Sequence, residues 1–407
     1  MKIKMELLAP AGNLEKLKWA MVYGADAVYF GTRFGSLRSF AGNFSLDDAA
    51  AGLELLHAAG KKGYVTLNIY PFSDEYGKLI QTAKTLDDMG ADAFIVSDLG
   101  LLAELRKLDL NAALHISTQA NTTSYQTVLT YGEIGAKRVN LARELSIEQI
   151  EQIQEKTRGR VETEVFINGA VCFSYSGRCA ISDYLAGFRA NRGECKQACR
   201  WKYALVEETR PGRYMPVYED EKGLYLFNSK ELALFEYVPR LKASGVAAVK
   251  IEGRMKSVHY IATVVSFYRQ ILDGKTFSWE QGLEFLNRVP NRGYSTGFMK
   301  GNIDSGDYQR DKSTSQSTSR FVGNVTEKKI NGRNILEVRN KILAGETLEI
   351  LSPDGSLSMI TLSDPLKTAE GIPVEYVNNS QFIQLDQDVV PYTILRRIEA
   401  SNCISTG

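Results

Sequence analysis

The hydrophobic and polar positions follow two alternating patterns from residue 1 to about residue 270. Short apolar runs of β type end near a Gly, Asn, Asp or Ser, and amphipathic runs with helical periodicity separate them. The predicted strands cover residues 6–10, 27–31, 64–68, 93–97, 113–117, 138–142, 163–169 and 247–253. The predicted helices cover residues 13–24, 45–60, 76–90, 99–108, 124–135 and 146–157.

Strands that alternate with helices pair in parallel. Eight such units predict an α/β fold in which a (β/α)8 barrel of the TIM type closes on itself. An open doubly wound sheet is the main alternative. The first strand is not followed by the Gly-x-Gly-x-x-Gly motif that would support a dinucleotide site in such a sheet.

The alternation breaks after the seventh predicted strand, where an insertion covers residues 171–223. A loop of that length is usually functional, and in a barrel it would lie at the C-terminal mouth, where active sites form. Within the insertion, residues 201–208 and 214–221 are predicted to pair as a hairpin.

The chain is predicted to divide near residue 305. Residues 1–304 form the barrel, taken as the catalytic domain, and the polar residues 305–320 form a linker. Residues 321–400 contain short apolar runs separated by turn residues, which predict a small all-β barrel domain.

The composition is that of an ordinary soluble protein, with 407 residues, 44% hydrophobic residues and a formal net charge of +1. The N-terminus lacks a signal-type apolar segment, and no run of 18 apolar residues occurs, so we expect a cytoplasmic protein without a membrane partner. In that compartment clustered cysteines indicate metal or redox chemistry more often than disulfides.

Four of the five cysteines lie within the insertion, at Cys172, Cys179, Cys195 and Cys199. Four thiolates on one loop can hold a structural zinc ion or a [4Fe-4S] cluster. The spacing between Cys172 and Cys179 is wider than zinc modules favour, which tilts the prediction towards iron and sulfur. Zinc is the alternative, and four unrelated thiols are the third interpretation.

Basic residues accumulate around these cysteines, with aromatic residues among them. Basic groups neutralise phosphates and aromatic rings stack on bases, a combination typical of proteins that bind single-stranded RNA. A solvated rim is an equally good interpretation. The candidate RNA-binding residues are Arg178, Arg189, Arg192, Lys196, Arg200 and Lys202.

If the barrel is correct, polar residues at the strand ends meet at its mouth. Lys250, Glu252 and Arg254 alternate along one strand, so they point the same way. The two cations suit a carboxylate or phosphate, and Glu252 suits an acid/base or a counter-ion. The other candidates at this rim are Asn68, Asp98, Gln119, Asn140 and Asn168.

His115 lies within a predicted strand, which favours a packed, hydrogen-bonded histidine over a catalytic one. The chain has three histidines and contains no His-Glu-x-x-His motif. The sequence therefore offers no recognised protease machinery.

Several blocks of the chain resemble the collagenase-like "unassigned" peptidase family. They occur in the family's order and cover residues 7 to about 300, and the C-terminal β module resembles the family's C-terminal domain. The blocks are LLAPAGNLEKLKWAMVYGADAVYFG, EVFINGAVCFSYSGRCAIS, NRGECKQACRWKY, VKIEGRMKS and NRGYSTGF.

Within this family, the block ANRGECKQACRWKY most resembles the members needed for tRNA hydroxylation. Those members make 5-hydroxyuridine at the wobble position and use prephenate rather than molecular oxygen. The resemblance implies a [4Fe-4S] cluster on the four cysteines. It also implies a role for Glu164, which matches the family's Glu-x-Phe-x-x-Gly motif together with Phe166 and Gly169.

The sequence thus predicts an RNA-modifying enzyme that binds the anticodon region of tRNA and holds the uridine in the barrel mouth. Lys250 and Arg254, with Arg143, would anchor prephenate. The resemblance also implies that a related partner subunit takes part. The alternatives are a collagenase-like protease and a non-catalytic RNA-binding factor with zinc. The catalytic candidates are Glu252, Glu164 and His115, and Asn68, Gln119 and Asn168 are further substrate-binding candidates.

Overall fold

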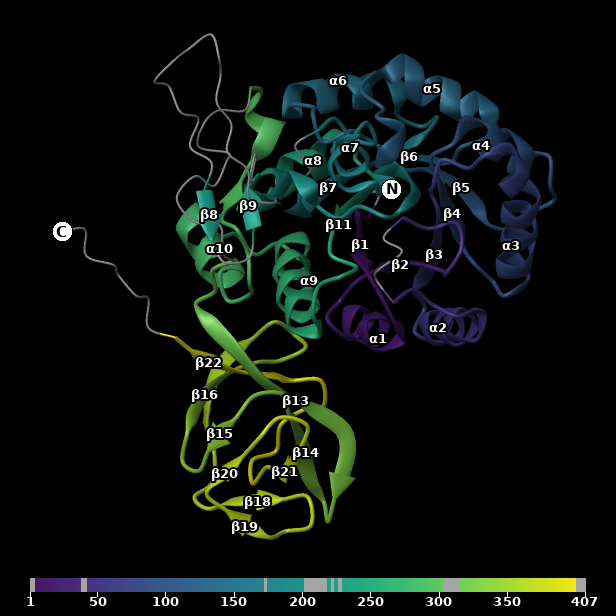
Figure 1. Ribbon diagram of the computed structural model, residues 1–407. Coiled ribbons are helices and arrows are strands. Elements are labelled where there is room, and N and C mark those ends of the chain that lie inside the picture. Colours follow the sequence, from purple (N-terminus) through teal and green to yellow (C-terminus); the bar gives the residue numbers. More distant parts are fainter. Residues whose placement is uncertain are drawn as a thin grey trace. The chain divides into compact units, whose positions relative to one another are not determined.

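The computed structural model describes residues 4–37, 42–171, 174–200, 218–220, 223–225, 229–302 and 315–399. The chain divides into two compact units (Figure 1). The first comprises Met1–Met21, Ala25–Lys256 and Arg292–Ser315. The second comprises Val22–Gly24, Ser257–Asn291 and Gln316–Gly407.

Eight parallel strands of the first unit close into a barrel, because β11 pairs with β1 on one side and with β7 on the other. This confirms the predicted (β/α)8 fold and excludes the open sheet. The strands are β1 (Glu6–Pro10), β2 (Ala27–Gly31), β3 (Lys62–Leu67), β4 (Ala93–Val96), β5 (Ala113–Ile116), β6 (Arg138–Asn140), β7 (Glu162–Ala170) and β11 (Ala248–Ile251).

Helices connect successive strands and surround the barrel (Figure 1). Ser45, Ser124 and Ser146 each accept a backbone N–H at a helix start, which satisfies a donor that the helix itself leaves unpaired. The helices are α1 (Leu14–Val22), α2 (Leu46–Ala58), α3 (Tyr76–Asp88), α4 (Leu99–Arg106), α5 (Tyr125–Ile134), α6 (Ile147–Thr157) and α8 (Val238–Ser244), with short 3-10 turns at η1 (Ser73–Glu75), η2 (Thr118–Ala120), η5 (Phe235–Tyr237) and η6 (Gly297–Lys300).

The insertion after β7 has its own short elements. They are α7 (Ile181–Ala186), η3 (Ala190–Arg192), η4 (Ala198–Arg200), and the antiparallel strands β8 (Tyr218–Asp220) and β9 (Gly223–Tyr225). Residues 201–208, predicted to form one arm of a hairpin, lie outside the described residues. The chain then returns along β7 as β10 (Glu231–Ala233), an antiparallel strand that pairs in turn with β12 (Tyr294–Ser295).

The second unit joins two helices to an all-β module, and the all-β C-terminal part confirms that element of the fold prediction. The two helices lie within residues 1–304, the range predicted as the barrel domain. Its main sheet has eight strands in the order β17-β16-β22-β13-β14-β21-β18-β19. Of the predicted linker 305–320, residues 315–320 are described, and a strand begins at Ser319. The helices are α9 (Val258–Leu272) and α10 (Trp279–Leu286), and the strands are β13 (Ser319–Ile330), β14 (Arg333–Val338), β15 (Ile342–Leu343), β16 (Thr347–Leu351), β17 (Leu357–Thr361), β18 (Leu366–Thr368), β19 (Pro373–Val374), β20 (Tyr376–Val377), β21 (Phe382–Gln384) and β22 (Ile394–Ile398).

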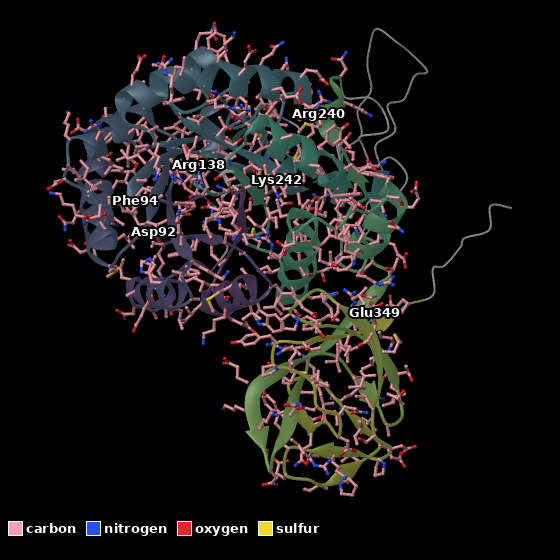
Figure 2. The ribbon with its side chains drawn as sticks, turned by 180° about the vertical axis from the view of Figure 1, so that it is seen from behind. Asp92, Phe94, Arg138, Arg240, Lys242 and Glu349 are labelled. Carbon is pink, nitrogen blue, oxygen red and sulfur yellow. The ribbon has the colours of Figure 1, made fainter. Side chains whose placement is uncertain are left out.

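The barrel interior is partly charged. Arg138 on β6 donates to Glu6 at 2.6 Å and pairs with Glu162 at 2.7 Å, and Tyr64 donates to the same Glu6 carboxylate. Figure 2 shows Arg138 among the side chains that fill the barrel. No helix in the described part of the chain is long and apolar enough to span a bilayer.

Candidate active site

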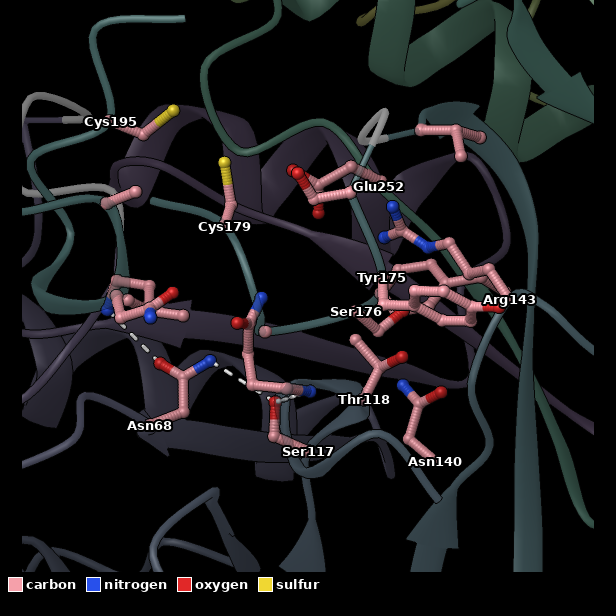
Figure 3. Close-up of a pocket in the computed structure, with 18 of the residues that line it drawn as sticks. Asn68, Ser117, Thr118, Asn140, Arg143, Tyr175, Ser176, Cys179, Cys195 and Glu252 are labelled. Atoms are coloured by element: carbon pink, nitrogen blue, oxygen red, sulfur yellow. Dashed lines mark hydrogen bonds between the residues drawn. The ribbon is translucent and has the colours of Figure 1, made fainter. Parts of the chain in front are cut away.

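A pocket lies at the C-terminal mouth of the barrel, with a volume of about 140 Å³ (Figure 3). Parallel strands bring their carboxyl ends to one rim, which is why residues far apart in sequence meet there. The strand ends supply Asn68, Ser117, Thr118, Gln119, Asn140, Arg143, Lys250, Glu252 and Arg254, and the insertion supplies Tyr175, Ser176, Gly177, Cys179, Cys195 and Cys199.

The insertion is attached to the loops around this mouth. Ser176 donates through its backbone N–H to Glu144 at 2.7 Å, and its hydroxyl contacts both oxygens of the same carboxylate at 3.2 Å. Gly177 has a φ of +74° and packs so closely on the carbonyl oxygen of Gln119 that a Cβ would overlap it. These contacts fix the start of the cysteine-bearing segment above β5 and β6.

Lys250 lies in the wall of the pocket and is 3% exposed. Its Nζ donates to Glu164 Oε1 at 3.0 Å and lies 4.4 Å from the centre of the Tyr29 ring. Burial lowers the pKa of Lys250, and the carboxylate of Glu164 opposes that shift. The Lys250 charge is thus held in place by an ion pair rather than left open to solvent.

Glu164 is not among the pocket-lining residues, and it lies behind two residues that are. Besides Lys250, it accepts from Asn140 Nδ2 at 2.8 Å, and its Oε2 lies 3.6 Å from Arg138 Nη1. A buried carboxylate with three cationic or amide partners is well suited to hold other side chains in position. Glu164 therefore holds Asn140 and Lys250 in position and does not itself contact a ligand in the pocket.

Arg254 is also buried at the pocket. It donates from Nη1 to Ser36 Oγ at 2.6 Å and to Thr66 Oγ1 at 3.3 Å, and from Nη2 to the carbonyl oxygen of Leu37. The guanidinium is thus fixed by neutral acceptors, so its positive charge is not cancelled by these three partners.

Glu252 lies at the pocket next to Tyr29. The Tyr29 hydroxyl donates to Glu252 Oε2 at 3.1 Å and to the Ile251 carbonyl at 3.0 Å. Burial, and then the charge of Glu252, raise the pKa of Tyr29 well above its ordinary value, so the phenol remains a donor. Figure 3 shows the Glu252 carboxylate facing the pocket.

The remaining substrate-binding candidates separate into two groups. Arg143 stacks on Phe166 at 4.0 Å and donates to the Ala170 carbonyl at 2.8 Å, and among the described residues its buried Nε has no hydrogen-bond partner. Asn68 and Gln119 also line the pocket, and Asn68 accepts from the Leu37 N–H at 3.1 Å. Asn168 is buried in β7 and does not line the pocket.

His115 lies inside the barrel and not at the pocket. Its ring meets the Tyr64 ring edge-on at 4.9 Å. Burial lowers the pKa of His115 well below its ordinary value, with the nearby Arg138 and Lys250 adding to the shift. The ring is therefore neutral. None of the three histidines, all of which are described, lines the pocket.

Three of the four clustered cysteines, Cys179, Cys195 and Cys199, line the same pocket and are half-buried. Cys172 lies outside the described residues. Within the described ranges, no three His, Cys, Asp or Glu side chains are close enough together to hold a metal ion. The thiol donors suit an iron–sulfur or zinc site chemically. The three described thiols line the same pocket, but they do not lie close enough together to ligate one metal ion as they stand.

The basic residues of the insertion differ in their contacts. Arg178 and Arg189 are exposed. Arg189 and Arg192 lie over the Phe72 ring at 5.4 and 4.6 Å, and Lys196 lies over Phe188 at 4.4 Å. The side chain of Arg200 and all of Lys202 lie outside the described residues.

Several residues that shape the site were not singled out from the sequence as functional. Tyr29 and Phe166 form aromatic walls, Glu144 holds the insertion, and Arg138 braces Glu164. The alternation of β2 and β7 could have identified Tyr29 and Phe166 as inward-facing. Nothing local in the sequence distinguishes Glu144 from the other charged residues near it.

Comparison with known proteins gives one family. Residues 12–308 match the family described as Peptidase family U32, and residues 317–396 match the Peptidase family U32 C-terminal domain. The chain is 35% identical to "tRNA hydroxylation protein P" of Escherichia coli, covering 91% of each sequence. It is 37% identical to "23S rRNA 5-hydroxycytidine C2501 synthase" of E. coli, covering 66% of this chain and 39% of that protein. It is 30% identical to "Collagenase" of Porphyromonas gingivalis, covering 73% of each.

Proposed function

The chain belongs to peptidase family U32, and on that premise we propose that it is an enzyme that hydroxylates tRNA, converting the wobble uridine to 5-hydroxyuridine. Two relatives named for RNA hydroxylation support this, one of them over nine-tenths of the chain.

The observation that carries the proposal is the composition of the pocket. Three cationic side chains, Arg143, Lys250 and Arg254, meet amide side chains and thiols at the open end of the barrel. The insertion that lines the same pocket presents exposed Arg178 and Arg189. Cations bind phosphates, and a flipped base can enter a pocket at the barrel mouth, so RNA is proposed to approach this end.

We assign the dicarboxylate prephenate to the cationic side of the pocket as co-substrate. Arg143 offers a buried Nε that no described residue uses, and a guanidinium suits a carboxylate. Lys250 and Arg254 add positive charge that neighbouring side chains hold in place. Glu252 is the proposed acid/base, because it is the catalytic candidate whose carboxylate lines the pocket.

We also propose that Cys172, Cys179, Cys195 and Cys199 hold a [4Fe-4S] cluster, which supplies redox chemistry when bound. The support is that the three described thiols line the pocket in which the reaction is proposed to occur. Anaerobic purification tests this directly. Iron and sulfide in near-equal amounts, with about four of each per chain, agree with the assignment. A colourless protein with one zinc ion contradicts it.

The decisive test of the function is nucleoside analysis of tRNA from a deletion strain. We expect 5-hydroxyuridine and its derivatives to disappear and to return when the gene is restored. The purified protein should then form 5-hydroxyuridine on that tRNA only with prephenate present. The assay is run with and without lysate of the deletion strain, because the resemblance also implies a related partner subunit. If the modified nucleosides persist in a strain without paralogues, the proposal is wrong.

A further inference from the structure

Asn140, at the end of β6, is 2% exposed and lines the pocket. Figure 3 shows it on the same side of the pocket as Arg143 and Tyr175. Its Nδ2 donates to Glu164 Oε1 at 2.8 Å. Its other polar atom, Oδ1, is buried and has no hydrogen-bond partner among the described residues.

The orientation of this amide is fixed by its neighbour. An ionised carboxylate can only accept hydrogen bonds, so it must face the NH2 end of an amide. Glu164 is ion-paired with Lys250 at 3.0 Å on the same oxygen that Asn140 contacts. Turning the amide over would place Oδ1 against that carboxylate. This is unfavourable, because both groups are hydrogen-bond acceptors and neither can donate. The ion pair therefore locks Oδ1 away from Glu164.

A buried acceptor without a donor is unfavourable until a ligand supplies one. A ligand that replaces solvent at Asn140 Oδ1 is therefore favoured when it brings an N–H or O–H group. Uracil has a donor at N3–H, whereas cytosine has an acceptor at N3. Tyr175, which also lines the pocket and is 63% exposed, offers a flat ring on which a base can stack.

We propose that Asn140, held by the Glu164–Lys250 ion pair, is the residue that selects uracil over cytosine, by accepting a hydrogen bond from uracil N3–H. This rests on the proposed function, because it names the base that the pocket receives. Cytosine in the same place would set its N3 acceptor against Oδ1. A site that leaves a buried acceptor unpaired discriminates strongly against the wrong ligand.

The test uses anticodon stem-loop RNAs that differ only at the wobble base: uridine, cytidine or N3-methyluridine. The methylated base removes the donor without changing the protein. Binding to the anaerobically purified protein is measured for each RNA, and 5-hydroxypyrimidine formation is measured in the same samples. We expect the wild type to bind the uridine RNA about tenfold or more tightly than either of the others.

Three variants complete the test. In Asn140→Leu the preference for uridine should fall to less than about twofold, since the acceptor is gone. In Glu164→Gln the new amide can donate to Oδ1, so Asn140 can turn over, and the ratio of uridine to cytidine affinity should shift towards cytidine. Glu162→Gln is the matched control, since Glu162 pairs with the same Arg138 at 2.7 Å but does not contact Asn140. Its preference should equal that of the wild type.

Equal wild-type affinity for the three RNAs overturns the inference, as does an unchanged preference in Asn140→Leu. A tenfold rise in the prephenate KM of Asn140→Leu, with base preference retained, would show that Oδ1 serves the co-substrate and would also overturn it. A base preference that depends on Asn140, without any hydroxylated product from the wild type even when prephenate and lysate of the deletion strain are added, would reject the proposed function and leave base selection standing.

Discussion

Arg192 of the insertion and Glu75 of η1 form a two-point ion pair, in which Nη1 of Arg192 lies 2.9 Å from Oε2 and Nη2 lies 2.5 Å from Oε1 of Glu75. Arg192 also donates to the Tyr70 carbonyl at 3.1 Å. The pair joins the cysteine-bearing insertion to the loop that follows β3. A residue expected from the sequence to contact RNA is thus engaged in holding the insertion against the barrel.

Replacing Glu75 with Gln should loosen the insertion. A partly exposed, bidentate pair contributes about 0.5–1 kcal/mol, so we expect faster amide hydrogen exchange in residues 189–196 and little change in overall stability. Glu104→Gln is the control. The Glu104–Lys107 pair is similarly close, at 2.6 Å, but it links Glu104 of α4 only to the residue that follows the helix. Equal exchange in the two variants would contradict the role of the pair.

The same pair predicts a pH dependence. Hydrogen bonds from Arg192 lower the pKa of Glu75 from 4.5 to about 2. Because the folded-state pKa lies below the unfolded one, the contribution of the pair is complete above about pH 4.5 and is lost as the pH falls towards 2. The hydrogen-exchange protection factors of residues 189–196, which correct for the slower intrinsic exchange at low pH, should therefore decrease in the wild type as the pH falls from about 4.5 towards 2. In Glu75→Gln this decrease should be absent.

Two glycines of the insertion allow a matched comparison. Gly177 and Gly187 both have left-handed backbone, with φ of +74° and +67°. A Cβ on Gly187 would meet nothing within 4 Å, whereas one on Gly177 would overlap the Gln119 carbonyl. We expect Gly187→Ala to lower stability by about 1 kcal/mol. Gly177→Ala should have a much larger effect and should reduce iron bound per chain after anaerobic purification. Equal iron content in the two variants would show that this close approach does not position the cysteines.

Arg254→Gln should reduce hydroxylation by at least about tenfold, since a charged group that anchors an anion contributes a charge-assisted hydrogen bond. Iron and sulfide content should remain that of the wild type, because the acceptors that fix the guanidinium, on Ser36, Leu37 and Thr66, lie outside the cysteine-bearing insertion. Arg240→Gln is the control. Arg240 pairs with Glu148 and Glu151 outside the pocket, and its loss should leave activity unchanged. Full activity of Arg254→Gln would remove Arg254 from the site.

In the second unit, Arg396 should be essential for stability. It is 0% exposed and donates from Nε to Glu349 Oε1 at 2.6 Å (Glu349 is labelled in Figure 2). Removing Arg396 takes this donor from Glu349 and leaves Arg288, at 3.2 Å, as the remaining cation, so Arg396→Met should cost about 1–3 kcal/mol in urea unfolding. Arg320→Met, which removes a 58% exposed partner of Glu399, should cost about 1 kcal/mol or less. A similar loss of unfolding free energy in Arg396→Met and Arg320→Met would contradict the stabilising role of the buried pair.

The sequence by itself determined the barrel. The strands predicted at 6–10 and 27–31 are β1 and β2 without any shift, and the other six differ from the structure by a few residues at their ends. Periodicity is a local property, because it reports which faces of a segment are buried. Lys250, Glu252 and Arg254 line one pocket, but β11 ends at Ile251, so Glu252 and Arg254 follow the strand and do not alternate along it as predicted.

Only the tertiary structure decided which partner each polar group has. Lys250 pairs with Glu164 on the neighbouring strand β7, and Arg254 pairs with Ser36 in the segment after β2. Asn140 lines the pocket while Asn168 does not. Alternation along β22 puts Arg396 and Arg397 on opposite faces, but only the packed sheet decides that Arg396 is the buried one. The physical reason is that hydrogen-bond partners depend on strand register and on closure of the barrel between β7 and β11. Register and barrel closure bring together residues that are distant along the chain, so no local sequence pattern predicts which hydrogen bonds form.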